Sequence, residues 1–472
     1  MQETIVLYPI PGIGHLVSMV ELGKLILRHH HHHLSVTVLL TTGRFDSLTT
    51  TAYVNQISQT IPSLIFHHFP SLPPEVPFAP APAPAPRSPF SDLFDFIANN
   101  NQNLLQALQS ISETSTIRAL IIDIFANAAL KISSALSIPT YHFCTSGIAS
   151  VALMLYFPTI HNQTTQSFKD LTNIYLHCPG LPPLRATHMP EPLLNRDDQP
   201  YHEFLHIAYS LAKSRGILVN TFEALEPRVA KALSDGLCVP NASTPPLYYI
   251  GPLLANPENR TSECLEWLDS QPYRSVVFLC FGSDGVFSAE QLKEIAIGLE
   301  QSGHGFLWVV RNPQKKRFSV ALEPDLDALL PEGFLDRTRE RGLVVKSWAP
   351  QVEVLSRESV GGFVTHCGWN SILEAVCAGM PMVAWPLYAE QHINHNLLVE
   401  DMKLAMAMER REEDGFVSAT EVEKRVRALM DSEDGRAMRE RCREMKEEAL
   451  AAWVKDGSSL TAFGKFAQSW ES

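Results

Sequence analysis

Short apolar runs alternate with longer segments of helical periodicity along the first half of the chain. Residues 4–10, 36–42 and 64–69 form such runs, and residues 16–28 repeat apolar positions at helical spacing. A short apolar run bounded by turn residues is typical of a buried strand. Strands that alternate with helices predict a parallel sheet with helices on both faces. We therefore predict an α/β fold for this half.

Further apolar runs continue the same alternation to the middle of the chain. We predict strands at residues 119–122, 139–145, 216–222 and 247–253, and a helix that starts at Glu223. Residues 147–160 are strongly apolar but fall short of the ~18 apolar residues that a membrane-spanning helix needs. We expect a buried helix there and no membrane span.

A second alternation starts near residue 276 and has its own strands and helices. The predicted strands cover residues 276–281, 306–311, 342–347, 360–365 and 382–386, and the predicted helices cover 289–301, 352–355 and 369–378. From residue 418 onward the pattern is helical and charged. A chain of 472 residues is too long for one ordinary core, so two domains are expected.

The composition between the two alternations indicates a linker. Residues 255–262 are polar and contain proline, which is typical of a segment between domains. We place an N-terminal domain at residues 1–246, a linker at 247–262 and a C-terminal domain at 263–452. Residues 453–472 are assigned to a final helix.

Charge and cysteine usage narrow the class of protein. The formal net charge of −13 argues against nucleic acid and anionic membranes as partners, since both select basic patches. The eight cysteines form no CxxC pair, and Cys280, Cys367 and Cys377 lie in apolar runs. With no basic signal region at the start, this usage favours the reducing cytoplasm.

Three segments interrupt the alternation. The histidines at 29–33 and the Ala-Pro repeat at 79–89 are interpreted as surface loops, the second extended like polyproline. Residues 312–327 are charged and contain proline, so we expect a mobile loop there.

The stretch at residues 348–391 carries a set of polar side chains suited to binding one ligand. The predicted helix at residues 369–378 begins after a glycine and carries Asn370 and Ser371 in its first turn. The N–H groups and the dipole at such a helix end attract anions, and His366 adds a further donor. We predict a diphosphate site at this helix end.

Other side chains of the stretch suit the remaining parts of a nucleotide sugar. Glu374 lies one turn beyond Asn370 on the same face, where its carboxylate can accept hydrogen bonds from both hydroxyls of a ribose. Trp348 offers a flat surface for a base, and Glu390 and Gln391 suit sugar hydroxyls. Together these positions predict a nucleotide-sugar site.

The order and spacing of these residues resemble the plant family of UDP-glycosyltransferases. The resemblance is carried by WAPQ, HCGWNS and WPLYAEQ within residues 348–391, and it extends from PGIGHLVSMVELGKLIL near the start to the final helices. FEALEP and LPEGFLDRT look like the branch that acts on flavonoids, chalcones and other phenols. The resemblance implies the GT-B fold, two facing Rossmann-like domains with the acceptor in the first and the donor in the second. It also implies that residues 453–472 return to the first domain.

The resemblance implies a role for each matching residue. Trp348 would stack on uracil, Ala349 and Gln351 would bond the base, and Glu374 would hold the ribose. The residues implied at the diphosphate are His366, Gly368, Asn370, Ser371 and Ser283, and those implied at the sugar are Trp369, Glu390, Gln391 and Thr145. Acceptor contacts are implied for Ile10, Phe125 and Tyr388.

The reaction that the resemblance implies needs a base. A phenol has a pKa of about 10, so its proton must be removed as its oxygen attacks. A neutral histidine serves near pH 7 when a carboxylate fixes its tautomer. His15 and Asp123 follow predicted strands at one sheet edge and match the family's base and its partner. Inversion would give a β-glucoside from UDP-glucose, with fixed donors stabilising UDP and without a metal or other cofactor.

The last position of the stretch bears on the sugar. In the resembled family a glutamine there goes with glucose and a histidine with galactose. Gln391 offers both an amide donor and a carbonyl acceptor to adjacent equatorial hydroxyls. We expect UDP-glucose to be favoured over UDP-galactose by about ten- to a hundredfold.

Two positions depart from the family's pattern. Ala126 stands where relatives usually have a cysteine, and Asp284 stands where relatives commonly carry an apolar or small residue. The carboxylate of Asp284 is interpreted as solvated rather than as steering a polyphenol.

Other functions remain open at the level of the sequence. The same base would serve C-glucosylation of a phenol-activated ring carbon. A nicotinamide-dependent oxidoreductase using the turn at Gly12 lacks the third glycine of its motif, where Val17 stands. A non-catalytic UDP-sugar sensor would not need His15 and Asp123. We expect a cytoplasmic monomer whose partners are a UDP-sugar and a phenolic acceptor of undetermined identity.

Overall fold

The computed structural model describes residues 2–29, 34–43, 45, 48–72, 88–255, 262–313 and 322–471. Unit 1 comprises Met1–Leu181, Arg185–Ala255 and Trp453–Ser472, and unit 2 comprises Pro182–Leu184 and Asn256–Ala452. The segments predicted as loops at 29–33, 79–89 and 312–327 lie wholly or partly outside the described residues. Of the predicted linker at 247–262, residues 256–261 lie outside them, whereas residues 247–249 form a strand of unit 1 and unit 1 extends to Ala255.

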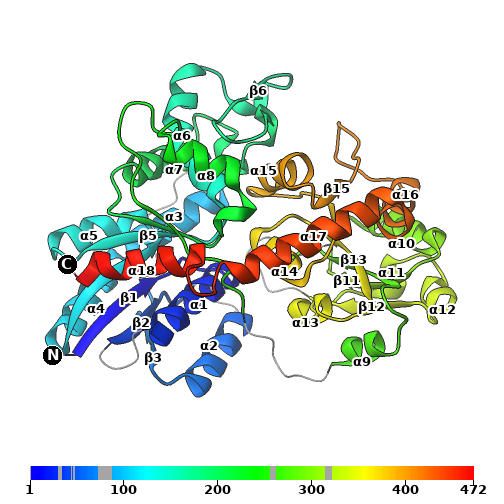
Figure 1. The fold of residues 1–472 in the computed structure, drawn as a ribbon, viewed down its shortest axis with the longest axis horizontal. Coiled ribbons are helices and arrows are strands. Elements are labelled where there is room, and N and C mark those ends of the chain that lie inside the picture. The colour runs from blue at the N-terminus through cyan, green and yellow to red at the C-terminus, as the bar shows by residue number, and fades with distance from the viewer. Residues whose placement is uncertain are drawn as a thin grey trace, which may run out of the picture. The chain divides into compact units, whose positions relative to one another are not determined.

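Unit 1 is built on a seven-stranded sheet in the order β3-β2-β1-β4-β5-β8-β9 (Figure 1). Every neighbouring pair of strands is parallel. The strands are β1 (Gln2–Tyr8), β2 (Leu34–Leu40), β3 (Leu64–His68), β4 (Ser115–Asp123), β5 (Thr140–Cys144), β8 (Ile217–Val219) and β9 (Leu247–Tyr249). Each lies on one of the predicted apolar runs.

The chain after β8 differs from the prediction of a helix starting at Glu223. A 3-10 turn occupies Glu223–Leu225, and α8 (Pro227–Ser234) begins only at Pro227. Proline lacks an N–H group and fits the first turn of a helix, where that group has no intrahelical partner. The position of the proline therefore sets the start of α8.

Helices cover both faces of the unit 1 sheet. Along β1, Ile5 and Leu7 belong to one core and Val6 and Tyr8 to the other, because successive side chains of a strand point to opposite faces. Residues of α1 (Ile13–His29), α2 (Leu48–Thr60) and α18 (Ser458–Glu471) complete the first core, and residues of α3 (Pro89–Asn99) and α4 (Asn101–Thr114) complete the second.

The long apolar run forms the predicted buried helix, α6 (Ile148–Gln163). The carboxylate of Glu226 accepts hydrogen bonds from the backbone N–H groups of Ile148 and Ala149, both at 2.9 Å, at the start of this helix. Unit 1 also contains α5 (Leu130–Ala135) and α7 (Gln199–Leu211). Among the described residues, no helix has the length and apolar character required to cross a bilayer.

The C-terminal helix α18, red in Figure 1, packs on the sheet of unit 1. The ring of Phe466 lies 5.1 Å from that of Tyr141 and 5.4 Å from that of Tyr248. The Tyr141 hydroxyl lies 3.0 Å from the backbone oxygen of Ser469 and donates to it. Helix α18 thus completes the core on one face of the sheet, against β4, β5 and β9.

Unit 2 is built on a six-stranded sheet in the order β12-β11-β10-β13-β14-β15 (Figure 1). All of its neighbouring strands are parallel. The strands are β10 (Val276–Cys280), β11 (Gly305–Val310), β12 (Gly342–Lys346), β13 (Val360–Thr365), β14 (Met382–Ala384) and β15 (Ala405–Ala407). The helices are α9 (Glu263–Asp269), α10 (Ala289–Ser302), α11 (Leu326–Leu329), α12 (Phe334–Thr338), α13 (Gln351–Leu355), α14 (Trp369–Ala378), α15 (Gln391–Asn396), α16 (Ala419–Asp431) and α17 (Glu433–Ala451).

Each sheet reverses its strand order at one internal point. The reversal lies between β1 and β4 in unit 1 and between β10 and β13 in unit 2. In doubly wound sheets, ligands bind outside the carboxyl ends of the strands at such a switch point. The predicted α/β class with two Rossmann-like units is confirmed, and the two switch points are the places to look for chemistry.

Candidate active site

The first cluster of functional side chains lies at the switch point of unit 1. His15 is in the first turn of α1, shortly after β1, and Asp123 is the last residue of β4, which pairs with β1. The chain enters α1 through Gly12, whose φ of 129° suits a residue without a side chain. Strand order thus joins two residues that are 108 positions apart.

The imidazole of His15 and the carboxylate of Asp123 form a close pair. His15 Nδ1 lies 2.7 Å from Asp123 Oδ2, with 29% of the His15 side chain exposed and only 1% of the Asp123 side chain. The other carboxylate oxygen, Oδ1, accepts a hydrogen bond from the backbone N–H of Phe125 at 3.0 Å. Nδ1 therefore carries the proton, and Nε2 is the basic nitrogen.

Strand β5 brings two more side chains near this pair. Thr145 follows β5, and its Oγ1 lies 3.3 Å from His15 Nδ1, so this residue belongs to the unit 1 cluster. His142, which no sequence motif indicated, is buried on β5 with its Nδ1 2.7 Å from Ser214 Oγ. Burial lowers the pKa of His142 to about 4, so this histidine is neutral at pH 7.

A cavity of about 130 Å³ lies beside the same cluster. Its lining comes from the carboxyl ends of β1, β2 and β3 and from α2: Pro9, Ile10, Pro11, Gly12, Leu16, Leu40, Thr41, Phe45, Thr50, Thr51, Val54 and His68. Ile10 thus lines this space, whereas Phe125 sets its ring edge-on to His15 at 6.0 Å. The exposed lining is about evenly divided between apolar and polar groups, which suits part of an aromatic molecule that carries hydroxyls.

The second cluster lies at the switch point of unit 2, where His366 follows β13 and Ser283 follows β10. The ring of His366 packs between Gly282 and Gly368, because a Cβ atom at either glycine would lie 2.4 Å from Nε2. Burial is the main reason why the pKa of His366 falls to about 4; Arg311 lowers it further and Asp284 opposes. His366 is therefore a neutral donor at pH 7. The side chain of Asp284, interpreted from the sequence as solvated, is half-buried.

The loop between His366 and α14 has a strained backbone. Cys367 has a φ of 66°, which is unusual for a residue with a side chain. Asn394 Nδ2 donates to the carbonyl oxygen of Cys367 at 3.0 Å, and the Cys367 N–H donates to Thr365 Oγ1 at 3.3 Å. Asn394 was missed in the sequence, because its role depends on a contact across 27 residues. The loop delivers Asn370 and Ser371 to the first turn of α14, as predicted.

A hydrogen-bonded set connects α13 to α14. Gln351 Nε2 donates to Glu374 Oε2 at 2.6 Å and to Ser371 Oγ at 2.8 Å. Burial raises the pKa of Glu374 to about 7, and the hydrogen bond from Gln351 only partly opposes this rise. Trp348, before α13, is 55% exposed and Ala349 is buried, so the indole ring has an open face.

Gln391 uses its side chain differently from the sequence expectation. It is buried, and its Oε1 accepts hydrogen bonds from the backbone N–H groups of Leu387 and Tyr388, both at 2.9 Å. Two donors already fill this acceptor, so only the amide hydrogens can serve a sugar. Glu390 precedes Gln391 at the cap of α15, and the Tyr388 ring lies 6.0 Å from that of His366, so Tyr388 belongs to unit 2.

Arg410 is a third residue that the sequence did not indicate, after His142 and Asn394. Its Nη1 donates to the carbonyl oxygen of Pro386 at 2.8 Å and so holds the segment that carries Gln391.

Among the described residues, no group of three or more histidine, cysteine, aspartate or glutamate side chains is arranged to hold a metal ion.

Comparisons with known proteins place these clusters in a family. A family model described as UDP-glucoronosyl and UDP-glucosyl transferase matches residues 234–438. UDP-glycosyltransferase 88F4 of Malus domestica is 52% identical over 486 residues, which cover 99% of this chain and 100% of the relative. Phloretin 2'-O-glucosyltransferase of Malus domestica is 51% identical over 488 residues, with the same coverage of each chain.

A solved structure shares the whole fold. Phytolacca americana UGT2, complexed with UDP-2fluoro-glucose and pterostilbene, has a TM-score of 0.87 at 35% identity and is matched over 100% of both chains. Identity at half of all positions over the full length, with two doubly wound units of matching fold, leaves one conclusion. The chain belongs to the family of plant UDP-glycosyltransferases.

Proposed function

We propose that this protein transfers glucose from UDP-glucose to a hydroxyl group of a phenolic acceptor, such as a flavonoid or chalcone, and so forms a β-O-glucoside. The observation that carries the proposal is the His15–Asp123 pair, 2.7 Å apart, beside a cavity lined by apolar, hydroxyl and imidazole side chains. The relative named for glucosylating phloretin, and the neighbour complexed with UDP-2fluoro-glucose and pterostilbene, support these substrate classes.

His15 acts as the general base in this proposal. Its Nε2 takes the proton of the acceptor hydroxyl while the acceptor oxygen bonds to the anomeric carbon of glucose. The bond from that carbon to the diphosphate oxygen breaks, and UDP leaves with the electron pair. Attack from the face opposite the leaving group turns the α-linked donor into a β-glucoside. Asp123 stabilises the imidazolium that forms, and Phe125 keeps the carboxylate in place.

Unit 2 binds the donor in this proposal. The exposed face of Trp348 stacks on uracil, and the carboxylate of Glu374 accepts hydrogen bonds from the ribose. The remaining assignments are Ala349 and Gln351 to the base, Ser283, His366, Gly368, Asn370 and Ser371 to the diphosphate, and Trp369, Glu390 and Gln391 to the sugar. The neutral His366 ring and the start of α14 supply fixed donors to the leaving diphosphate.

Unit 1 binds the acceptor in this proposal, and Thr145, whose Oγ1 lies 3.3 Å from His15 Nδ1, is assigned to the sugar. The N-terminal domain (1–246) is assigned to the acceptor and the C-terminal domain (263–452) to UDP-glucose, with residues 453–472 joining the first. Ile10 and Phe125 of unit 1 are assigned to acceptor contacts, and so is Tyr388, which belongs to unit 2. The protein acts as a cytoplasmic monomer and needs no cofactor beyond its two substrates.

The test uses the wild-type protein and its His15→Ala variant with UDP-glucose and a panel of polyphenols, read by mass spectrometry. We expect a hexose added by the wild type and a rate ~10²–10⁴-fold lower for the variant, because the base is lost. UDP affinity, measured by calorimetry, should not change. Full turnover by His15→Ala would refute the assignment of the base. A product that resists acid and β-glucosidase would show a C–C bond instead of an O-glucoside.

A further inference from the structure

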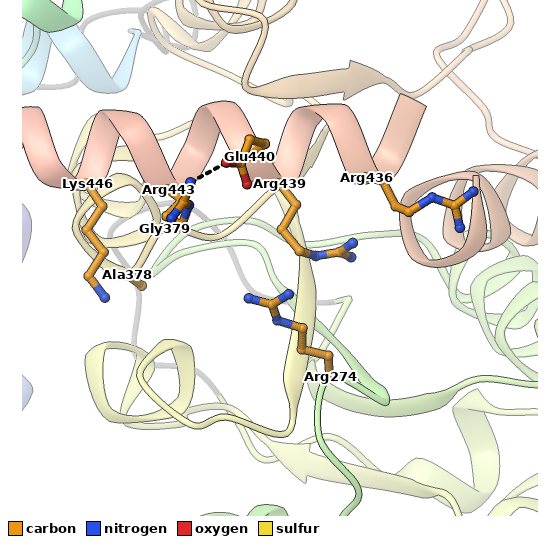
Figure 2. A pocket seen from close by; sticks show the side chains of 8 residues that line it. All are labelled: Arg274, Ala378, Gly379, Arg436, Arg439, Glu440, Arg443 and Lys446. Atoms are coloured by element: carbon orange, nitrogen blue, oxygen red, sulfur yellow. Dashed lines mark hydrogen bonds and ion pairs between the residues drawn. The ribbon is translucent and has the colours of Figure 1, made fainter. Parts of the chain in front are cut away.

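A cavity of about 380 Å³ in unit 2 is lined largely by basic side chains (Figure 2). Four of them, on α17, are spaced three or four residues apart and so share one face of the helix. The fifth precedes β10. The cavity lining consists of Arg274, Ala378, Gly379, Arg436, Arg439, Glu440, Arg443 and Lys446.

This cavity is separate from the cluster around His366. Arg274 lies before the amino end of β10, and Ala378 and Gly379 lie at the C-terminal end of α14. The residues assigned to the diphosphate lie instead at the carboxyl ends of the strands and at the N-terminal end of α14. The ten residues of α14 separate the two regions by about 15 Å at 1.5 Å per residue.

The basic side chains that line the cavity outnumber the carboxylates that pair with them. Arg443 pairs with Glu440, and Arg436 pairs with Glu433. The guanidinium group of Arg274 lies instead over the ring of Tyr273, 4.8 Å from its centroid. Lys446 lies against the end of α14, since a Cβ atom on Gly379 would come within 3.3 Å of its Cδ. Among the described residues, no carboxylate forms an ion pair with the remaining three cations of the cavity, Arg274, Arg439 and Lys446.

Arg439 shows this imbalance most directly. Its Nη2 donates to the carbonyl oxygens of Gly361 at 3.1 Å and Leu429 at 3.4 Å, which orients the guanidinium group. Its Nε is buried, and no described residue accepts a hydrogen bond from it. Burial and the charges of Arg274 and Arg436 lower the pKa of Arg439. A bound anion would offset the repulsion among these guanidinium groups.

The end of α14 alone does not account for this arrangement. One cation at a helix C-terminus compensates the dipole, and Lys446 already lies there. Five basic side chains around one concavity, in a chain with a formal net charge of −13, form a local site of the opposite sign.

We propose that this cavity binds a compact, multiply charged phosphate anion, such as pyrophosphate or the phosphate groups of a free nucleotide. Guanidinium forks bind phosphate oxygens in pairs, and Lys446 adds a point charge. The concave shape favours a small ion over an extended surface. The proposal does not depend on the identity of the acceptor or of the sugar.

The test is a calorimetric titration of the full-length protein with pyrophosphate. The donor site can also hold a diphosphate, so the assignment rests on variants that leave the donor residues unchanged. We expect Arg274→Gln and Lys446→Gln each to weaken one binding event about tenfold or more. Arg441→Gln, on α17 but outside the cavity lining, removes the same charge and should leave that event unchanged. Glucosyl transfer should stay at the wild-type rate in all three variants, which confirms that they fold.

Several outcomes would overturn the proposal. The first is that no binding event is weakened by Arg274→Gln or by Lys446→Gln. The second is that Arg441→Gln weakens pyrophosphate binding as much as these variants do, which would indicate only long-range electrostatic attraction. Titrations with orthophosphate, pyrophosphate and ATP then distinguish the source of the anion. Binding that strengthens from orthophosphate to pyrophosphate without a gain from ATP identifies an inorganic ligand. A further gain with ATP, lost in Arg274→Gln, identifies a nucleotide.

Discussion

At the scale of single residues, the orientation of the Asp123 carboxylate decides which ring nitrogen of His15 carries the proton. The N–H of Phe125 holds Oδ1 at 3.0 Å, so Oδ2 faces His15 Nδ1 at 2.7 Å. An acidic residue in this place does more than add negative charge. It fixes both the tautomer and the angle of the ring.

We predict that Asp123→Asn is more damaging than Asp123→Ala. The Phe125 N–H will bind the asparagine carbonyl, which turns the NH₂ group toward His15 and places the histidine proton on Nε2. That nitrogen then cannot act as a base, and kcat/KM should fall about 10⁴-fold. Alanine leaves the tautomer free, so its loss should be smaller. Steady-state kinetics of the two variants provides the measurement, and a larger loss with alanine would contradict this account.

The raised pKa of Glu374 predicts a pH dependence of UDP binding. Near pH 7 the ligand-free carboxyl loses its proton, and only the carboxylate can accept hydrogen bonds from both ribose hydroxyls. UDP affinity should rise with pH up to about 7 and then level off. Calorimetry across this range checks the prediction, with Glu374→Gln as the control, since that variant cannot ionise. A dependence that persists in Glu374→Gln would belong to the ligand or to another group.

The raised pKa of Glu374 also makes the stability of the protein depend on pH. Folding raises the pKa of Glu374 from 4.5 to about 7, so the folded protein binds this proton more tightly than the unfolded chain does. The contribution of this group to stability is complete below pH 4.5 and is lost as pH rises through 7. UDP binding and stability therefore respond to this group in opposite directions.

At the scale of elements, the imidazole ring of His366 packs between the turn after β10 and the start of α14. We predict that Gly282→Ala weakens UDP binding about tenfold or more. The new Cβ atom would lie 2.4 Å from the His366 ring, and the backbone φ of 71° is strained for alanine. Gly303→Ala is the matched control, because Gly303 has a similar φ of 76° but nothing within 4 Å of its Cβ position. Calorimetry with UDP should show a loss only in Gly282→Ala.

Predictability differed among the elements for physical reasons. The sequence placed β13 and α14 at their observed bounds, because a continuous apolar run and a helical period are local signals. It missed β15, whose three residues are too few to show a period, and it started α8 too early. The strand β15 depends on the neighbour that it packs against, and the start of α8 depends on a single proline.

At the scale of the whole molecule, the last helix stabilises the unit that contains His15. We predict that Phe466→Ala lowers the free energy of unfolding by about 3–5 kcal/mol, as expected for a fully buried phenylalanine. Denaturation in urea measures this loss. UDP affinity of the folded protein should stay unchanged, because α18 belongs to unit 1. Loss of UDP binding without loss of stability would contradict this division.

The sequence by itself determined the α/β class and the family, because periodicity and a contiguous motif are properties of neighbouring residues. The nucleotide-sugar stretch stays a prediction. The comparisons and the structure confirm the fold class, and the matched family has the GT-B fold. The tertiary structure alone decided the contacts between distant residues. Strand order joins His15 to Asp123, Asn394 holds Cys367, and backbone N–H groups occupy Gln391 Oε1.

The basic cavity is the clearest case of what only the fold could decide. Arg274 and the arginines of α17 are more than a hundred and fifty positions apart, and each looks like an ordinary surface cation in a chain with a formal net charge of −13. Packing of α17 against the end of α14 and the amino end of the sheet brings them around one concavity. No local sequence pattern predicts this cavity, because it depends on how α17, α14 and the start of β10 pack together.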